Sequence, residues 1–314
     1  MQTVITADAL QGLKTLPDGV ADMCVTSPPY FGLRNYGVEG QIGIEKTPEE
    51  YIQKLVAIFY EVKRVLHNDG TLWLNIGDSY WNSNGFARTC EKFKREGMLD
   101  APANDRKLPP HPILKVKDLI GIPWMLAFAL RADGWYLRQD IIWHKPNPMP
   151  ESVTDRCTKA HEYIFLLSKS ERYYFDNNAI KEPTLSPPTL RNKNAEGYQA
   201  NYAKGERFSQ GTRIYGADGV KNKRDVWTIN LKPSKESHFA VFPPDLIRPC
   251  ILAGSRNSGV VLDPFFGSGT TGVVAVEEGR NYIGIELNPS YVERASKRIR
   301  EVVDKLSIKE ETLF

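Results

Sequence analysis

Residues 260–272 read Val-Val-Leu-Asp-Pro-Phe-Phe-Gly-Ser-Gly-Thr-Thr-Gly, and this stretch decides the fold class. The apolar run that opens it is typical of a buried strand, and the glycines mark a tight turn into a helix over 270–278. A second buried-type strand over 282–286 follows that helix and ends on Glu286. A strand, a glycine-rich turn, a helix and a strand predict one βαβ unit of a parallel α/β sheet.

The same alternation continues outward along the chain. Mostly parallel strands covered by helices on both faces are therefore expected. Strands are predicted over 3–6, 20–26, 71–76, 135–143, 161–167, 260–263 and 282–286, with an edge hairpin at 173–175. Helices are predicted over 10–16, 123–131, 243–253, 270–278 and 291–306. A further helix is predicted to begin after an N-cap at Thr47 and to stop at Asn68-Asp69-Gly70.

The glycine-rich turn predicts a cofactor loop. Gly267, Gly269 and Gly272 satisfy G-x-G-x-x-G, and Glu286 lies about twenty residues after the first of them, where a ribose-binding acid belongs. Asp263 stands at the strand tip, where it would repel a pyrophosphate but attract the ammonium of S-adenosylmethionine. The pattern favours S-adenosylmethionine. A NAD(P)-linked enzyme and a plain glycine turn stay open as alternatives.

A second motif, Thr26-Ser27-Pro28-Pro29-Tyr30, follows the strand predicted over 20–26. Each proline fixes its own φ and pushes its predecessor into an extended conformation, so this strand end is stiff. The Ser27 hydroxyl and the backbone carbonyls form a row of acceptors beside an aromatic ring. That arrangement suits hydrogen bonding to the amino group of a planar base, although a proline-rich turn without any function would show the same sequence pattern.

Composition and charge set broader limits. The 314 residues hold four cysteines and no Cys-x-x-Cys pair, so we expect a reduced, cytoplasmic protein without a structural metal site. No apolar run reaches the roughly 20 residues of a membrane span, and the N-terminus lacks a signal-peptide pattern. The net charge is only +3, but basic residues gather in two loop-like stretches, 88–117 and 191–224, and aromatics are interleaved in the second. Such loops are plausible contacts for a polyanion, although a solvated surface explains either stretch taken alone.

Both motifs together resemble the DNA amino-methyltransferases, which methylate an exocyclic nitrogen of a base. Ser27 to Tyr30 match that family's catalytic signature, and 263–271 match its cofactor signature. Because the catalytic motif comes first, the chain resembles the β class. That resemblance implies a circularly permuted Rossmann-like methyltransferase fold, a mostly parallel seven-stranded sheet with one antiparallel strand.

The resemblance also implies roles for particular residues. The catalytic group is Ser27, Pro28, Pro29 and Tyr30. The S-adenosylmethionine site is Asp8, Thr26, Asp263, Pro264, Phe265, Gly267, Ser268, Gly269, Thr270, Thr271, Glu286 and Asn288. Lys145, Arg191, Arg207 and Arg213 are expected to contact DNA.

The chain is expected to divide into three parts: a catalytic half over 1–183 with an insertion at 81–116, a target-recognition segment over 184–224, and a cofactor half over 225–314. The expected substrate is double-stranded DNA with a flipped base. We also expect a restriction endonuclease as a counterpart. The protein is expected to be a monomer or a homodimer.

The target atom is the finer question. Ser-Pro-Pro-Tyr resembles the N4-cytosine enzymes more than the N6-adenine enzymes, which usually carry Asp first, so we favour N4-cytosine. Covalent C5-cytosine methylation would need a cysteine nucleophile, but Cys250 lies in an apolar helical pattern typical of a buried structural residue. A non-catalytic DNA-binding protein and a protein or RNA N-methyltransferase are the remaining alternatives.

Overall fold

The computed structural model describes residues 2–33, 38, 40–81, 110–184, 189–191, 213–215, 219–231 and 242–311. The chain divides into two compact units, one formed by 1–176 and 225–314 and the other by 177–224. Each unit is described by itself. Among the described helices, none is both long and apolar enough to cross a membrane.

The larger unit is built on an eight-stranded sheet. In spatial order its strands are β1 (Gln2–Thr6), β12 (Asn281–Glu286), β11 (Val260–Asp263), β2 (Ala21–Thr26), β3 (Leu66–Ile76), β5 (His161–Ser168), β4 (Tyr136–His144) and β10 (Val226–Thr228). β5 is antiparallel to both of its neighbours, and the other pairings are parallel. The predicted mostly parallel sheet with one antiparallel strand is confirmed, and the short edge strand β10 is an addition to it.

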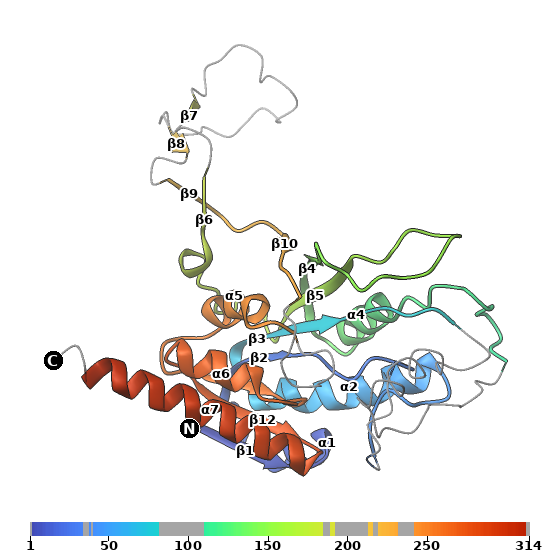
Figure 1. Ribbon diagram of the computed structural model, residues 1–314, viewed down its shortest axis with the longest axis horizontal. Coiled ribbons are helices and arrows are strands. Elements are labelled where there is room, and N and C mark those ends of the chain that lie inside the picture. Colours follow the sequence, from blue (N-terminus) through green and yellow to red (C-terminus); the bar gives the residue numbers. More distant parts are fainter. Residues whose placement is uncertain are drawn as a thin grey trace. The chain divides into compact units, whose positions relative to one another are not determined.

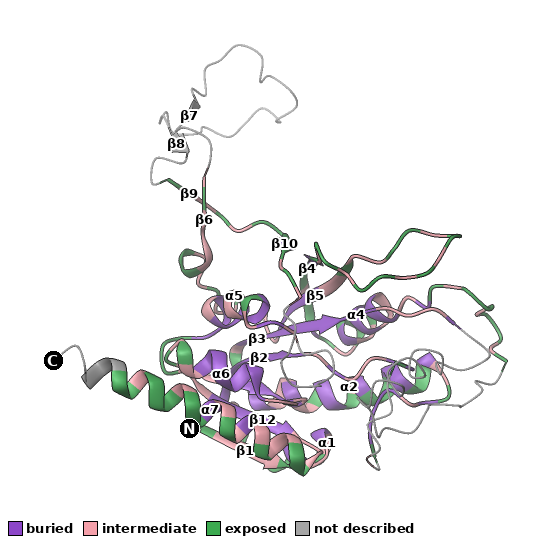
Figure 2. Cartoon of the chain, in the orientation of Figure 1, coloured by how far each residue is buried: buried purple, intermediate pink, exposed green. Residues whose placement is uncertain are grey.

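Helices cover both faces of this sheet. α1 (Ala9–Lys14), α2 (Pro48–Val65) and α4 (Ile122–Ala132) share one apolar core with Leu72 and Leu74 of β3. Trp73, between those two leucines, points to the opposite face, and there Gly254 of α5 (Pro244–Gly254) approaches it closely. α6 (Thr270–Glu277) and α7 (Pro289–Glu311) lie side by side (Figure 1). The strands between the helices are largely buried (Figure 2).

The start of α2 agrees with its sequence signals. Thr47 accepts a hydrogen bond from the Glu50 backbone N–H at 3.2 Å, and Pro48 occupies the first turn. Its end was predicted wrongly: α2 stops at Val65, and residues 68–70 belong to β3. Residues 173–175 also adopt no strand, so the predicted edge hairpin is absent there.

Sheet order brings the two halves of the sequence together. β11 pairs in parallel with β12 on one side and with β2 on the other, where Leu262 lies opposite Cys24. The carboxyl ends of β2 and β11 therefore share one edge of the sheet, which is where open α/β folds bind ligands. The loops that begin after Thr26 and Asp263 meet at this edge.

Among its described residues, the smaller unit contains two short antiparallel strand pairs. β6 (Glu182–Pro183) pairs with β9 (Val220–Lys221), and β7 (Thr189–Arg191) pairs with β8 (Arg213–Tyr215). Asn177 Nδ2 donates to Asn222 Oδ1 at 2.9 Å, so the two ends of the unit lie close together. A single 3-10 turn, η2 (Asn178–Ile180), precedes β6.

Most of the insertion predicted at 81–116 lies outside the described residues. Its two ends are described and are joined by a pair of backbone hydrogen bonds: Trp81 N–H donates to the Asp118 carbonyl at 2.8 Å, and Lys117 N–H donates to the Trp81 carbonyl at 2.9 Å. The two described ends of this stretch thus lie side by side.

Candidate active site

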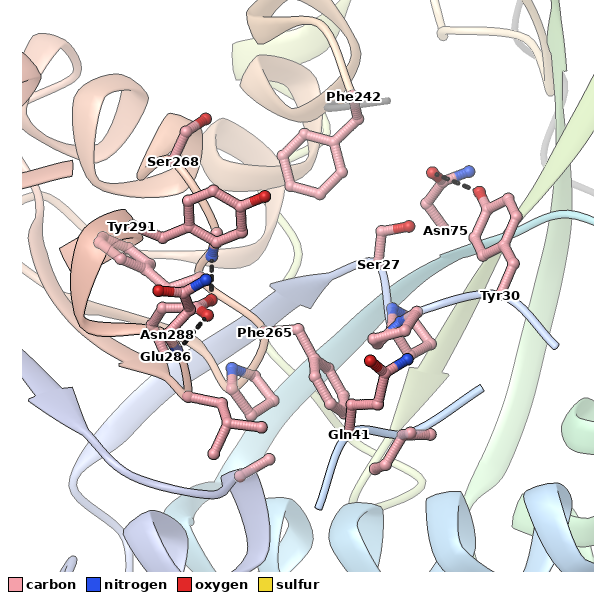
Figure 3. Close-up of a pocket in the computed structure, with 18 of the residues that line it drawn as sticks. Ser27, Tyr30, Gln41, Asn75, Phe242, Phe265, Ser268, Glu286, Asn288 and Tyr291 are labelled. Atoms are coloured by element: carbon pink, nitrogen blue, oxygen red, sulfur yellow. Dashed lines mark hydrogen bonds between the residues drawn. The ribbon is translucent and has the colours of Figure 1, made fainter. Parts of the chain in front are cut away.

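A pocket opens at the sheet edge where β2, β11 and β12 end (Figure 3). Its volume of about 240 Å³ is far larger than a single water molecule needs, so it suits an organic ligand. Both halves of the sequence line it. Thirteen of the predicted site residues lie in its wall: Asp8, Ser27, Pro28, Pro29, Tyr30, Lys145, Pro264, Phe265, Gly267, Ser268, Thr270, Glu286 and Asn288.

Glu286 fixes the glycine-rich loop from the end of β12. Its Oε2 accepts from the Gly267 N–H at 2.7 Å, and its Oε1 accepts from the Asn288 N–H at 2.8 Å. Burial raises the pKa of this carboxyl, while the backbone donors oppose the rise. A carboxylate has about four lone-pair sites, so Glu286 keeps acceptor capacity toward the pocket.

Gly269 explains why the loop needs glycine. Its φ of +79° is left-handed, and a Cβ there would lie 2.7 Å from the Ala295 Cβ of α7. The loop also rests on α7 through Arg298, whose Nη1 donates to the Ser268 carbonyl at 2.5 Å and to the Ser268 hydroxyl at 2.8 Å.

Asp263 does not lie in the pocket wall. Its carboxylate accepts from the Thr26 hydroxyl and the Thr271 hydroxyl, each at 2.6 Å, and from the Phe265 N–H at 3.0 Å. Burial is the main cause that raises its pKa to about 6. Buried hydrogen bonds among Thr26, Asp263 and Thr271 thus connect β2 to the loop. The structure does not bring these three residues or Gly269 to the pocket surface.

The Ser27–Tyr30 motif is held by contacts on its far side. Tyr51 of α2 donates to the Pro29 carbonyl at 2.8 Å, and the neighbouring Ser27 and Pro28 lie in the pocket wall. Figure 3 shows Ser27 on the same side as Tyr30 and Asn75, across from Glu286, Asn288 and Tyr291.

Tyr30 is locked in place. Its hydroxyl donates to Glu162 Oε2 at 2.7 Å and contacts Asn75 Oδ1 at 3.3 Å. Its ring packs against Gly77, where a Cβ would lie 2.6 Å from Cε2. Burial, followed by the Glu162 carboxylate, raises the pKa of Tyr30 well above its usual value, so the phenol stays neutral.

Several wall residues had no signal in the sequence. Glu162 comes from β5, and it pairs with Lys145, which follows β4. Trp143 of β4 also lines the pocket. Further wall residues that sequence reasoning missed are Gln41, Asn75, Phe242 and Tyr291. An aromatic residue in the first turn of the last helix, directly after Glu286 and Asn288, was the one available hint of Tyr291.

The four residues expected to contact DNA fall in different places. Lys145 lies in the pocket. Arg191 and Arg213 occupy paired positions in β7 and β8, and Arg207 lies outside the described residues. Cys250 is fully buried in α5, and its thiol contacts the Leu246 carbonyl at 3.5 Å, as a structural cysteine would.

The pocket therefore has two chemically distinct sides. One side presents the carboxylates of Asp8 and Glu286 with aromatic rings, which suits a ligand carrying hydroxyls, a cation and a flat ring. The opposite side presents neutral acceptors at Ser27 and Pro28 beside Tyr30 and Trp143, which suits a planar group that donates hydrogen bonds.

Comparisons with known proteins agree with this arrangement. The N6/N4 methyltransferase family model, described as DNA methylase, matches residues 21–297. The type II methyltransferase M.SmaI of Serratia marcescens is 49% identical over 94% of this chain and 90% of its own length. M.XycI of Xanthomonas campestris pv. cyanopsidis is 48% identical over 95% of this chain and 87% of its own length.

Solved structures show the same fold. The PvuII DNA methyltransferase (cytosine-N4-specific) superposes with a TM-score of 0.63 at 18% identity, covering 96% of this chain and 90% of that one. A putative DNA modification methylase from Thermus thermophilus, solved with S-adenosyl-L-methionine, gives 0.59 at 22% identity, covering 96% and 95%. The chain is thus a DNA methyltransferase and belongs to the N6/N4 DNA methylase family.

Proposed function

We propose that this protein transfers a methyl group from S-adenosylmethionine to the exocyclic N4 of a cytosine flipped out of double-stranded DNA. The observation that carries the proposal is that Ser27 and Pro28 lie in the pocket wall, where the serine hydroxyl and the proline carbonyl would serve as acceptors for an exocyclic amine. Ser-Pro-Pro-Tyr resembles the N4-cytosine branch of the family, and the PvuII enzyme, whose fold is similar, is described as cytosine-N4-specific.

The residues on the other side of the pocket fit S-adenosylmethionine. Glu286 offers acceptors for ribose hydroxyls, and Asp8 offers a carboxylate for the ammonium group. Asp8 fixes its orientation by capping α1, where its Oδ1 accepts from the Leu10 N–H at 3.0 Å. Phe265 and Tyr291 supply aromatic faces for adenine. When bound, this cofactor supplies an electrophilic methyl carbon on a sulfonium.

Positioning and electrostatics account for the catalytic role of the chain. An exocyclic amine is a weak nucleophile because its lone pair is delocalised into the ring. Acceptors at Ser27 and Pro28 would hold the two N–H bonds and favour a pyramidal nitrogen whose lone pair is directed at the methyl carbon. Tyr30 and Trp143 would flank the base and replace the stacking lost on flipping.

We infer the remaining features from the order of the elements. The catalytic motif precedes the cofactor loop, and β2 and β11 are neighbours, so the fold would be the circularly permuted β class. The segment 184–224 would recognise the DNA sequence through its basic residues, with Arg191, Arg207 and Arg213 as candidates. A restriction endonuclease counterpart would complete the system, as expected for the relatives that are type II methyltransferases.

Nucleoside mass spectrometry tests the proposed target atom. Purified protein is incubated with S-adenosylmethionine and unmethylated genomic DNA, and the DNA is then digested to nucleosides. N4-methylcytosine in DNA treated with the wild type, and far less of it after the same short incubation with Ser27→Ala, is the expected result. N6-methyladenine as the sole product would refute the choice of cytosine and keep the family assignment.

A further inference from the structure

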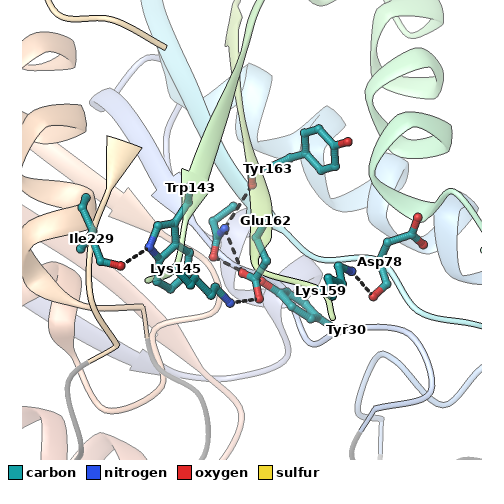
Figure 4. Close-up of polar contacts among 9 residues, drawn as sticks. Tyr30, Asp78, Trp143, Lys145, Lys159, Glu162, Tyr163 and Ile229 are labelled. Carbon is teal, nitrogen blue, oxygen red and sulfur yellow. Dashed lines mark hydrogen bonds and ion pairs between the residues drawn. The ribbon is translucent and has the colours of Figure 1, made fainter. Parts of the chain in front are cut away.

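A partly buried ion pair lies in the wall of the pocket, between Lys145 and Glu162 (Figure 4). The antiparallel register of β4 and β5 pairs His144 with His161, which carries Lys145 and Glu162 to the same end of the hairpin. Lys145 Nζ donates to Glu162 Oε1, and the two side chains are only 14% and 15% exposed. Trp143 lies beneath the ammonium, 4.2 Å from Nζ to the ring centroid.

Glu162 holds the catalytic tyrosine and the lysine at once. One carboxylate oxygen accepts from Tyr30 at 2.7 Å, and the other accepts from Lys145. Asn75 Nδ2 adds a longer contact to Glu162 at 3.4 Å and is itself fixed to the Tyr163 carbonyl at 3.1 Å. A buried ion pair stabilises a fold little, because desolvation of two charges offsets their attraction. This pair therefore calls for a role other than stability.

Residues with acceptor groups and a residue with a cationic donor line the same pocket. Ser27 and Pro28 supply the acceptors, and Lys145 has three N–H groups, one of which is directed to Glu162. A flipped base loses its pairing partner and must satisfy its Watson–Crick edge inside the enzyme. On an amino-bearing base that edge presents an N–H donor next to a ring-nitrogen acceptor. A keto base presents the opposite order.

We propose that Lys145 is a specificity-determining residue that donates a hydrogen bond to the ring nitrogen beside the target amine, N3 in cytosine. Glu162 is the positioning residue that fixes the ammonium relative to Tyr30, and Trp143 supports it from below. The cation takes over the role of the guanine N1–H that the base leaves behind, so amino-bearing bases are accepted and keto bases refused. This inference rests on the proposed function.

A double-mutant cycle between enzyme and substrate tests the contact. Wild type and Lys145→Met are compared on a duplex carrying the natural target base and on one where the ring nitrogen beside the amine is replaced by C–H. That analogue is 3-deazacytosine for a cytosine target or 1-deazaadenine for an adenine target, so the test does not depend on which base is methylated.

The expected result is non-additivity. The wild type should lose about 10- to 100-fold in kcat/KM on the analogue, as for a hydrogen bond to a charged group, and Lys145→Met should lose less than about threefold. Lys145→Arg should restore part of the difference because it keeps a cationic donor. Equal losses in the wild type and in Lys145→Met would overturn the proposal.

Salt dependence separates a base contact from a phosphate contact. Removing a phosphate contact lowers the slope of log K against log salt by about one, whereas a base contact leaves it unchanged. We expect Lys145→Met to keep the wild-type slope, and a change of about one would overturn the inference. Lys159→Met is the matched control, because its ammonium donates to the Asp78 carbonyl at 2.6 Å and lies outside the pocket wall.

The controls keep the two proposals distinguishable. Retained S-adenosylmethionine affinity and an unchanged melting temperature show that Lys145→Met is folded. A wild-type enzyme that methylates the natural duplex, combined with an additive cycle, refutes only the role of Lys145. A wild-type enzyme that methylates no DNA refutes the proposed function itself.

Discussion

Ser27 stands where a fully buried strand ends and two prolines begin, and this position makes its hydroxyl useful. The prolines remove backbone freedom after it, and Tyr51 holds the Pro29 carbonyl at 2.8 Å, so the acceptor row is preorganised. A fixed acceptor contributes to catalysis without the cost of ordering it in the transition state.

Replacing Ser27 by Ala should lower kcat by about 100-fold, the usual effect of removing one preorganised hydrogen-bonding group. The affinity for S-adenosylmethionine should stay within about twofold, because Ser27 lies on the opposite side of the pocket from Glu286. Single-turnover methyl transfer and calorimetric titration measure the two quantities. Wild-type kcat in the variant would remove Ser27 from the mechanism.

Cys250→Ala tests whether a cysteine nucleophile takes part in the reaction. The thiol is fully buried in α5 and is absent from the pocket wall, so we expect activity to be retained. Stability should fall by about 1 kcal/mol, because a small buried group is lost. Methyl transfer by a folded Cys250→Ala protein is the measurement, and complete loss of turnover would revive a cysteine nucleophile.

Tyr30 separates the role of a ring from that of a hydroxyl. Because the hydroxyl is already committed to Glu162, Tyr30→Phe should cost less than about tenfold in kcat/KM. Tyr30→Ala removes the aromatic face and should cost about 100-fold, as a stacking contact of about 1–3 kcal/mol predicts. Equal losses in both variants would show that the hydroxyl itself contacts the substrate.

At the residue scale the sequence predicted that both motifs contribute to one site, and residues of both line the pocket, but it did not predict every contact. Asp263 was expected to face the cofactor, yet it is buried beneath Thr26, a residue 237 positions away. The Lys145–Glu162 pair depends on the register of an antiparallel hairpin, and no spacing rule in the sequence specifies that register.

At the scale of elements, the buried hydrogen bonds of Asp263 between β2 and the glycine-rich loop make the stability of the fold depend on pH. Burial raises the pKa of Asp263 to about 6, above its unfolded value of about 3.9. The folded state then binds the proton more tightly, so this group's stabilising contribution is complete below pH ~4 and is lost as the pH rises through ~6. Over those two pH units the change is about 3 kcal/mol.

Urea unfolding from pH 4 to pH 7 tests this linkage. Asp263→Asn has no titrating carboxyl, so the free energy of unfolding of the wild type should fall relative to that of the variant as the pH rises. Asp304→Asn, an exposed change on α7, should track the wild type. A constant difference between the wild type and Asp263→Asn across this range would contradict the raised pKa.

α7 acts on the cofactor loop through Arg298. Arg298→Ala should raise the KM for S-adenosylmethionine by about tenfold with kcat little changed, because it frees Ser268 without touching the Ser27 side. Arg300→Ala, an exposed change on the same helix, is the control. Steady-state kinetics at saturating DNA gives both constants, and an unchanged KM would show that the loop holds its shape alone.

The elements themselves were largely predictable, since helical and strand periods are local. The exceptions have physical reasons. Asn68-Asp69-Gly70 looks like a helix stop, but β3 begins at Leu66, where the chain bonds to β2. Pairing with a strand thus overrides the local turn signal. β10 is only three residues long and is defined by its parallel pairing with β4.

At the scale of the whole molecule, the chain divides into the unit 177–224 and the unit formed by 1–176 and 225–314. Deleting the smaller unit tests whether DNA recognition can be separated from methyl transfer. Because Asn177 and Asn222 are hydrogen-bonded at 2.9 Å, a short Gly-Ser linker can replace the residues between them. S-adenosylmethionine affinity should be retained, whereas site-specific DNA binding should fall by about 1000-fold toward the non-specific level. An unchanged preference for the target site in a filter-binding assay would show that residues outside 177–224 recognise the DNA sequence.

The most direct test of the central claim is to methylate a genome free of modification with the purified protein and to sequence it with modification detection. We expect N4-methylcytosine at one short recurring sequence, with a much weaker signal from Ser27→Ala after the same incubation. Methyl groups on adenine N6 or cytosine C5, or no methylation by the wild type, would contradict it.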